Sequence, residues 1–171
     1  EASVRIGLVA GEASGDILGA GLIRAIRASR PDASFEGVAG PAMIEAGCEC
    51  WEPAESLAVM GLVEPLAHIP RLLRLRRELA RRWTESPPDV VVGIDAPDFN
   101  LGLEKKLRKA GVKTAHFVSP TIWAWRPGRV RTVRKAADLV LCIFPFEPAL
   151  YAKYDVEAVF VGMNPGPWGM A

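Results

Sequence analysis

Apolar residues recur along the chain in two alternating patterns. Short continuous apolar runs predict strands buried on both faces, and apolar residues spaced three and four apart predict helices. Strands are expected at residues 4–10, 34–38, 90–94, 112–118, 139–144 and 159–161, and helices at residues 16–29, 66–83, 99–109, 126–137 and 147–153. In the first helix, Ile17, Leu22 and Ala25 are expected to share the buried face. The alternation predicts an α/β fold, a Rossmann-like parallel sheet with helices on both faces.

Most of the unusual polar residues follow a predicted strand. They fall at residues 11–16, 40–41, 95–100, 119–126 and 145–147. In an open parallel sheet, ligands bind outside the carboxyl ends of the strands, so a site is expected at this edge. The first turn is not a dinucleotide loop, because its glycines do not follow the G-x-G-x-x-G spacing and it carries Glu12 and Asp16.

Composition and charge narrow the class of protein. The 171 residues hold 21 Lys and Arg against 20 Asp and Glu, so no nucleic-acid partner is expected. Three cysteines with no framework spacing predict free thiols in a reducing compartment, and Cys48 and Cys50 alone are too few for a structural zinc site. The printed sequence shows no signal-peptide pattern and no apolar run of membrane-spanning length.

The turn "GIDAPDFN" at residues 93–100 places two carboxylates and an amide between a strand and a helix. An aspartate in such a turn can serve as a general base toward a substrate hydroxyl. Alternatively, Asp98 or Asn100 can cap the helix that follows, and spacing alone favours this capping role over a catalytic one.

The segment "SPTIWAWRPGR" at residues 119–129 combines aromatic and basic side chains. Trp123 and Trp125 can stack on a sugar ring, while Arg126 and Arg129 can bind a phosphate. Packing of both tryptophans at the end of the domain is the alternative.

The stretch at residues 65–83 reads as a basic amphipathic helix with six arginines. Such a helix can lie on an anionic membrane surface, or it can be an ordinary surface helix with a solvated basic face. His68 and His116 have no partners at ligand spacing, and we expect both to be structural.

Six segments, in order from about residue 6 to residue 162, resemble the lipid-A-disaccharide synthase family. They are "VAGEASGDILGAGLI", "GVAGPAM", "LAVMGLVEPL", "GIDAPDFN", "HFVSPTIWAWRPGRV" and "FPFEPALYAKY". The resemblance implies the amino-terminal half of a glycosyltransferase-B fold. Residues 1–162 would form its acceptor-side domain and residues 163–171 an atypical tail rich in proline and glycine, with the donor-binding second domain absent.

The resemblance also implies a function. The family joins UDP-2,3-diacylglucosamine to 2,3-diacylglucosamine 1-phosphate, giving lipid A disaccharide phosphate and UDP, on the cytoplasmic side of the inner membrane of Gram-negative bacteria. No metal or cofactor is implied, and a homodimer is one expected assembly. We expect the chain alone to make no disaccharide, and a lipid-binding or membrane-binding module without catalysis is the alternative.

The matching motifs imply roles for particular residues. Asp98 corresponds to the catalytic base, and Asp95 is the second candidate. Substrate binding is implied for Gly11, Glu12, Ser14, Asp16, Met60, Asn100, Ser119, Trp123, Trp125, Arg126, Arg129 and Glu147. Contact with the membrane or with acyl chains is implied for Leu66, Ile69, Leu72, Leu73, Arg74 and Arg77.

The last segment, "VGMNPGPWGMA", is similar to a different motif, the first active-site motif of single-strand-selective uracil-DNA glycosylases. Asn164 would be the residue that positions water in that motif. Because a glycosylase must flip the base into a closed pocket, which so short a segment cannot build, we expect no uracil excision.

Overall fold

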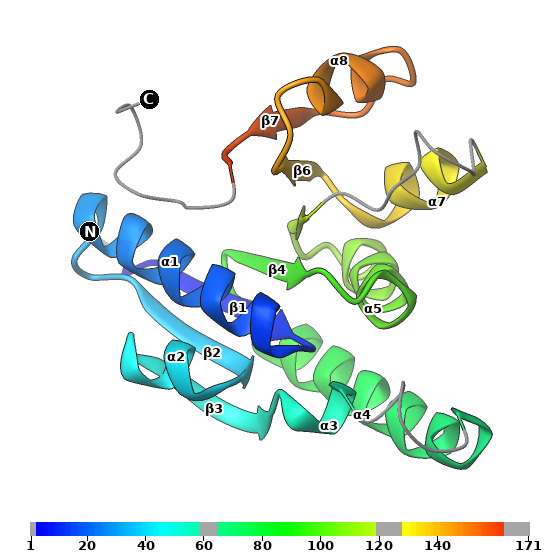
Figure 1. Cartoon of the computed structure of the whole chain (residues 1–171). Coiled ribbons are helices and arrows are strands. Elements are labelled where there is room, and N and C mark those ends of the chain that lie inside the picture. Colours follow the sequence, from blue (N-terminus) through cyan, green and yellow to red (C-terminus); the bar gives the residue numbers. More distant parts are fainter. Residues whose placement is uncertain (1–2, 59–64, 119–127, 163–171) are drawn as a thin grey trace.

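A computed structural model describes residues 3–58, 65–118 and 128–162. These residues form a seven-stranded parallel sheet in the order β3-β2-β1-β4-β5-β6-β7 (Figure 1). The strands are β1 Arg5–Ala10, β2 Ser34–Ala39, β3 Cys48–Pro53, β4 Val90–Ile94, β5 Thr114–Phe117, β6 Leu139–Cys142 and β7 Ala158–Phe160. The predicted α/β fold is confirmed, and all carboxyl ends of the strands lie along one edge.

Helices join successive strands and cover both faces of the sheet. They are α1 Ala13–Ser29, α2 Pro41–Glu45, α3 Glu55–Ala58, α4 Pro65–Glu85, α5 Pro97–Lys109, α7 Gly128–Ala136 and α8 Glu147–Ala152. One buried core joins α1 and α2 to the sheet, a second joins α4 and α5 to the other face, and a third surrounds β6 between α7 and α8.

Strand β1 shows why the strands read as continuous apolar runs. Ile6 and Leu8 face the core under α1, whereas Val9 faces the core under α4 and α5. Gly7 lies against the indole of Trp83, and a Cβ at this position would come within 2.7 Å of the ring. Because successive side chains point to opposite faces and both faces are covered, apolar residues occupy nearly every position.

The segment between β2 and α4 departs most from the predicted pattern. It forms α2, β3 and α3, none of which the apolar pattern predicts. Strand β3 lies at the edge of the sheet, and most of its side chains are exposed or half-buried. An edge strand has no need of a continuous apolar run, so its sequence "CECWEP" gives only a weak signal.

Helix α1 begins three residues before its predicted start, and one of the three residues expected on its buried face is exposed. Ile17 is 67% exposed, whereas Gly19, Leu22 and Ile23 are buried. A Cβ on Gly19 would meet the Met43 sulfur at 2.7 Å, so the glycine allows α1 and α2 to pack closely. The expectation that Ile17 belongs to the buried face is therefore wrong.

Candidate functional site

The β4–α5 turn lies at the carboxyl edge of the sheet and has an unusual backbone. Asp95 and Ala96 both adopt positive φ angles, 52° and 42°. Such a conformation costs non-glycine residues about 1–3 kcal/mol each, so it persists only where neighbouring groups enforce it. The Asp95 amide donates to the carbonyl of Phe117 at 2.8 Å, which ties the turn to the end of β5.

The side chain of Asn100 stabilises this turn by donating hydrogen bonds to backbone carbonyl groups. Its Nδ2 lies 2.9 Å from the carbonyl oxygen of Asp95 and 3.3 Å from those of Val9 and Ile94. Asn100 is fully buried, so these contacts are shielded from water. The substrate contact predicted for Asn100 is not what the structure shows, because its amide binds the backbone of two strand ends.

A buried pair of hydrogen-bonded side chains lies one helical turn further along α5. The Oε2 atom of Glu104 is 2.7 Å from Nδ1 of His116, and both side chains are completely buried. Gly93 leaves room for this pair, since a Cβ there would collide with Oε2 of Glu104. Burial raises the pKa of Glu104, although the neighbouring imidazole opposes that rise. His116 is structural as expected, but it is not isolated.

Asp98 is the second residue of α5 and points away from the core. Its side chain is 79% exposed, and its Oδ1 lies 3.5 Å from Nη2 of Arg129, at the start of α7. Residue Ala96 occupies the N-cap of α5, which has no side-chain capping hydrogen bond. The capping alternative for Asp98 and Asn100 is therefore wrong. Asp98 and Arg129, two residues predicted for the site, lie close together at the starts of α5 and α7.

Arg76 of α4 is a supporting residue that the sequence did not reveal. Its Nη2 donates to the main-chain carbonyl of Asp98 at 2.9 Å, and its guanidinium lies over the Phe99 ring. Partial burial lowers the pKa of Arg76. In the sequence it is one of six arginines in a run, and nothing there distinguishes it from its neighbours.

The turn after β1 contributes both exposed and buried residues. Glu12 and Ser14 are exposed, and Gly11 is buried against Ala96 of the β4–α5 turn. Asp16 has a structural role, because its two carboxylate oxygens each accept a hydrogen bond of 2.9 Å from the backbone at the start of α2. This cap replaces the side chain that Gly40, the N-cap of α2, lacks.

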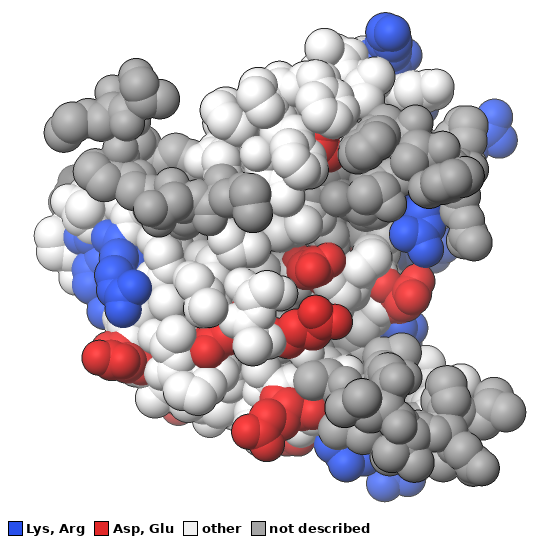
Figure 2. All heavy atoms as spheres, in the orientation of Figure 1, with Lys and Arg blue, Asp and Glu red and all other residues white. Residues whose placement is uncertain are grey.

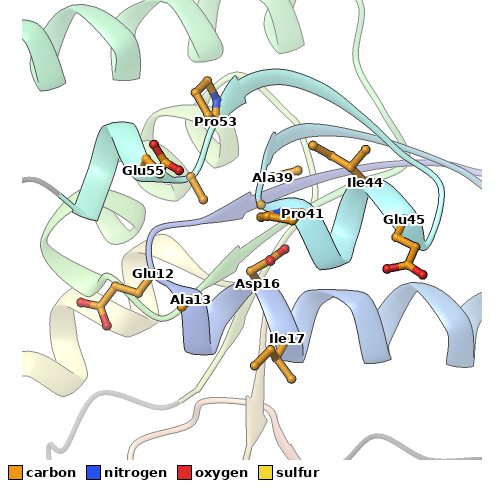
Figure 3. A pocket seen from close by; sticks show the side chains of 12 residues that line it. Glu12, Ala13, Asp16, Ile17, Ala39, Pro41, Ile44, Glu45, Pro53 and Glu55 are labelled. Atoms are coloured by element: carbon orange, nitrogen blue, oxygen red, sulfur yellow. The ribbon is translucent and has the colours of Figure 1, made fainter.

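A pocket of about 850 Å³ opens beside this turn (Figure 3). Its walls come from the starts of α1 and α2 and from the segment joining β3 to α3. The lining residues are Glu12, Ala13, Asp16, Ile17, Ala39, Gly40, Pro41, Ile44, Glu45, Pro53, Ala54 and Glu55. It therefore lies at the carboxyl ends of β1, β2 and β3, at the edge where a ligand is expected.

Glu147 is another predicted site residue with a structural role. It is 1% exposed, and its Oε1 accepts a hydrogen bond of 3.1 Å from the backbone amide of Phe144. The carboxylate therefore fixes the β6–α8 turn. A buried acid bonded to its own turn offers little to a substrate, so the expected substrate contact of Glu147 is wrong.

Helix α4 presents a mixed apolar and basic face. Ile69 and Leu73 are 40% and 43% exposed, and Arg74 and Arg77 are exposed beside them. Leu72 is only 6% exposed and packs in the core under α4 and α5, so its predicted membrane contact is wrong.

The far end of α4 is less basic than its sequence indicates. Arg81 pairs with Glu78 and Glu85, and the Arg82 guanidinium lies 3.5 Å from the centre of the Trp51 ring. Figure 2 shows acidic side chains across the middle of one face and basic side chains around its margin, toward α1, α4, α7 and α8.

Several predicted residues lie outside the described part of the chain. These are Met60, Ser119, Trp123, Trp125, Arg126 and Asn164, together with the side chain of Leu66. Within the described ranges, no three His, Cys, Asp or Glu side chains gather as metal ligands would. No helix among the same residues has the length and apolar character needed to cross a membrane.

The architecture matches the fold of solved structures. A UDP-GlcNAc 2-epimerase from Neisseria meningitidis, bound to UDP-GlcNAc, aligns over 93% of this chain and 46% of its own at a TM-score of 0.66 and 10% identity. MurG from Acinetobacter baumannii aligns over 97% of this chain and 47% of its own, with a TM-score of 0.56 and 14% identity. The fold is the amino-terminal half of the glycosyltransferase-B type.

The sequence narrows that class to one family. The family model for lipid-A-disaccharide synthetase matches residues 6–164, and the chain belongs to this family. The lipid-A-disaccharide synthases of Serratia proteamaculans and Xanthomonas campestris pv. campestris are 59% and 58% identical to it, each over 92% of the chain. The chain spans 41% and 36% of the length of these two relatives.

The buried pair predicts a pH-dependent change in stability. In His116→Phe, Glu104 would stay buried without its partner, and its pKa would rise further. A raised pKa in the folded state favours the protonated acid, so the free energy of unfolding should fall as the pH rises above about 4.3, the pKa of an unfolded glutamate. At neutral pH we expect a loss of about 3–5 kcal/mol, measured by urea denaturation.

The double variant Glu104→Gln/His116→Phe is the matched control. It retains the altered packing at position 116 but has no carboxylate to ionise, so this additional loss with rising pH should disappear. If the single and double variants show the same pH dependence, the Glu104–His116 pair does not account for it.

Proposed function

We propose that the chain supplies the acceptor half of a lipid-A-disaccharide synthase, with Asp98 as the general base. The observation that carries this proposal is the placement of Asp98. An exposed carboxylate stands at the strand-end turn, held by a fixed backbone and 3.5 Å from Arg129. Membership of the family supports the substrates, UDP-2,3-diacylglucosamine and 2,3-diacylglucosamine 1-phosphate.

In the proposed reaction, Asp98 takes the proton from the 6-hydroxyl of the acceptor sugar. The hydroxyl oxygen then attacks the anomeric carbon of the donor as its bond to UDP breaks, and inversion gives a β-1,6 linkage. Arg129 would bind the acceptor phosphate when substrate is present.

Replacing Asp98 by Asn in the full-length protein tests this role. The amide keeps the size of the side chain but cannot accept the proton. We expect kcat for disaccharide formation to fall by about a hundredfold to ten-thousandfold, the range that general-base catalysis supplies. The fold should persist, because the Asp98 side chain is 79% exposed and caps no helix.

Asp95→Asn distinguishes the two candidate bases, and the exposed Asp32→Asn controls for the loss of a surface charge. The proposal requires Asp98→Asn to be by far the slowest of the three variants. Near-normal turnover by Asp98→Asn would exclude it as the base, and a larger loss in Asp95→Asn would transfer the role to Asp95.

We further propose that α4 brings this protein to the cytoplasmic surface of the inner membrane. Ile69 and Leu73 expose apolar surface one helical turn apart, and Arg71, Arg74 and Arg77 are exposed nearby. Apolar insertion together with attraction to anionic lipid is the pattern of a helix that lies on a membrane. The arginines at the far end of α4 have their own protein partners and are not part of this surface.

A triple variant, Arg71→Gln/Arg74→Gln/Arg77→Gln, tests the proposed surface. Each basic side chain near an anionic membrane contributes about 1 kcal/mol, so sedimentation with phosphatidylglycerol vesicles should weaken by about a hundredfold. Binding of the wild type should also weaken as salt increases.

Lys105→Gln/Lys106→Gln/Lys109→Gln is the matched control, since these exposed lysines of α5 remove the same charge elsewhere. Equal losses in the two triple variants would mean that net charge alone drives the association. Binding that is unaffected by salt would contradict the electrostatic part of the proposal.

A further inference from the structure

The 850 Å³ pocket and the β4–α5 turn lie next to each other at the carboxyl edge of the sheet. The pocket lining begins at Glu12, and the preceding residue, Gly11, is packed against the turn, because a Cβ at this position would lie 2.9 Å from Cβ of Ala96. A ligand bound beside Asp98 therefore has the pocket as a neighbouring surface.

The lining of the pocket is suited to an apolar ligand. Seven of its twelve residues carry aliphatic or proline side chains: Ala13, Ile17, Ala39, Pro41, Ile44, Pro53 and Ala54. Ile17 and Ile44 are 67% and 48% exposed, although large apolar side chains are normally covered. Figure 3 shows them on α1 and α2, the two helices that bound the pocket.

The acidic residues of the lining do not provide a site for an anion. Asp16 directs both carboxylate oxygens to backbone amides of α2, so both are already engaged in hydrogen bonds. Glu12, Glu45 and Glu55 are exposed. Their negative charge disfavours a phosphate in the pocket, whereas Arg129, which lies 3.5 Å from the Asp98 carboxylate, does not line the pocket.

We propose that this pocket holds a fatty acyl chain of one of the two sugar substrates while its sugar lies next to Asp98. This inference rests on the proposed function and adds to it the place where an acyl chain binds. The hydrocarbon occupies the part of the pocket that is lined by Ile17 and Ile44. The phosphate of the substrate binds outside the pocket, near Arg129. The volume falls within the range of pockets that enclose small ligands.

The acyl chain would gain affinity by leaving water. Burial of one methylene is worth about a fourfold change in affinity, so chain length should strongly affect catalysis while the chain still fills the pocket. A group that occupies the pocket should remove this dependence without removing the general base.

The experiment measures kcat/KM of the full-length protein with acyl chains shortened separately on the donor and on the acceptor. For the chain that enters the pocket, wild type should lose about fourfold for each methylene removed. Ile44→Trp, which fills the pocket from an exposed position, should abolish that dependence and retain turnover of the shortest substrates.

Val159→Trp is the control, because Val159 is a similarly exposed apolar residue on β7, away from the pocket. It should keep the chain-length dependence of wild type. If Ile44→Trp also keeps it, the acyl chain lies elsewhere and the pocket proposal is wrong, while measured turnover still supports the proposed function. If the wild-type full-length protein forms no disaccharide from any of these substrates, the proposed function itself is contradicted.

A binding measurement on the 171-residue chain gives a readout independent of activity. Octyl glucoside below its micelle concentration presents a sugar joined to an alkyl chain. Titration should shift the methyl resonances of Ile17 and Ile44 and leave Ile143, which follows β6, unchanged. Unchanged resonances of Ile17 and Ile44 would overturn the proposal, as would equal shifts at all three residues.

Discussion

The geometry of the site depends on the contacts of one buried amide. Asn100 binds carbonyl oxygens at the ends of β1 and β4 and in the following turn, where two successive non-glycine residues have left-handed backbones. Without that support, Asp95 and Ala96 would relax toward ordinary conformations and α5 would begin in a different direction. The pair Glu104–His116 supports the same region from beneath, joining α5 to β5. Asp98 therefore owes its position to side chains that are buried behind the turn.

The parallel sheet explains why so many different groups meet at one edge. Each strand delivers a turn to the same side, and each turn has a different chemical character. The turns after β1, β2 and β3 surround an apolar pocket, and the turn after β4 supplies an exposed carboxylate. Arg129 reaches that carboxylate from the start of α7. An amphiphilic sugar that carries hydrocarbon at one end and phosphate at the other matches this sequence of surfaces.

The sequence predicts best those strands that are covered on both faces of the sheet. The predicted bounds of strand β4 are the observed ones, because a strand that is covered on both faces must be apolar throughout. The apolar pattern does not predict strand β3, because this strand lies at the edge of the sheet. Among the acids that follow strands, Asp98 is exposed, whereas Asp16 caps a helix that begins 25 residues later. No local pattern separates these two acids, because the partners of Asp16 become neighbours only in the folded chain. Glu147 differs, because its partner is the amide of Phe144, three residues earlier in the chain. Leu72 shows that helical periodicity identifies an apolar face without saying what covers it.

A double-mutant cycle tests most directly whether Asn100 acts by positioning Asp98. Turnover of the full-length protein would be measured for Asn100→Ala, Asp98→Asn and the double variant, with folding of each checked by its thermal transition. If Asn100 contributes only through Asp98, the double variant should be no slower than Asp98→Asn alone, because the base it positions is already gone. Independent effects that multiply in the double variant would contradict this dependence, and normal turnover by Asn100→Ala would show that the turn does not need the amide.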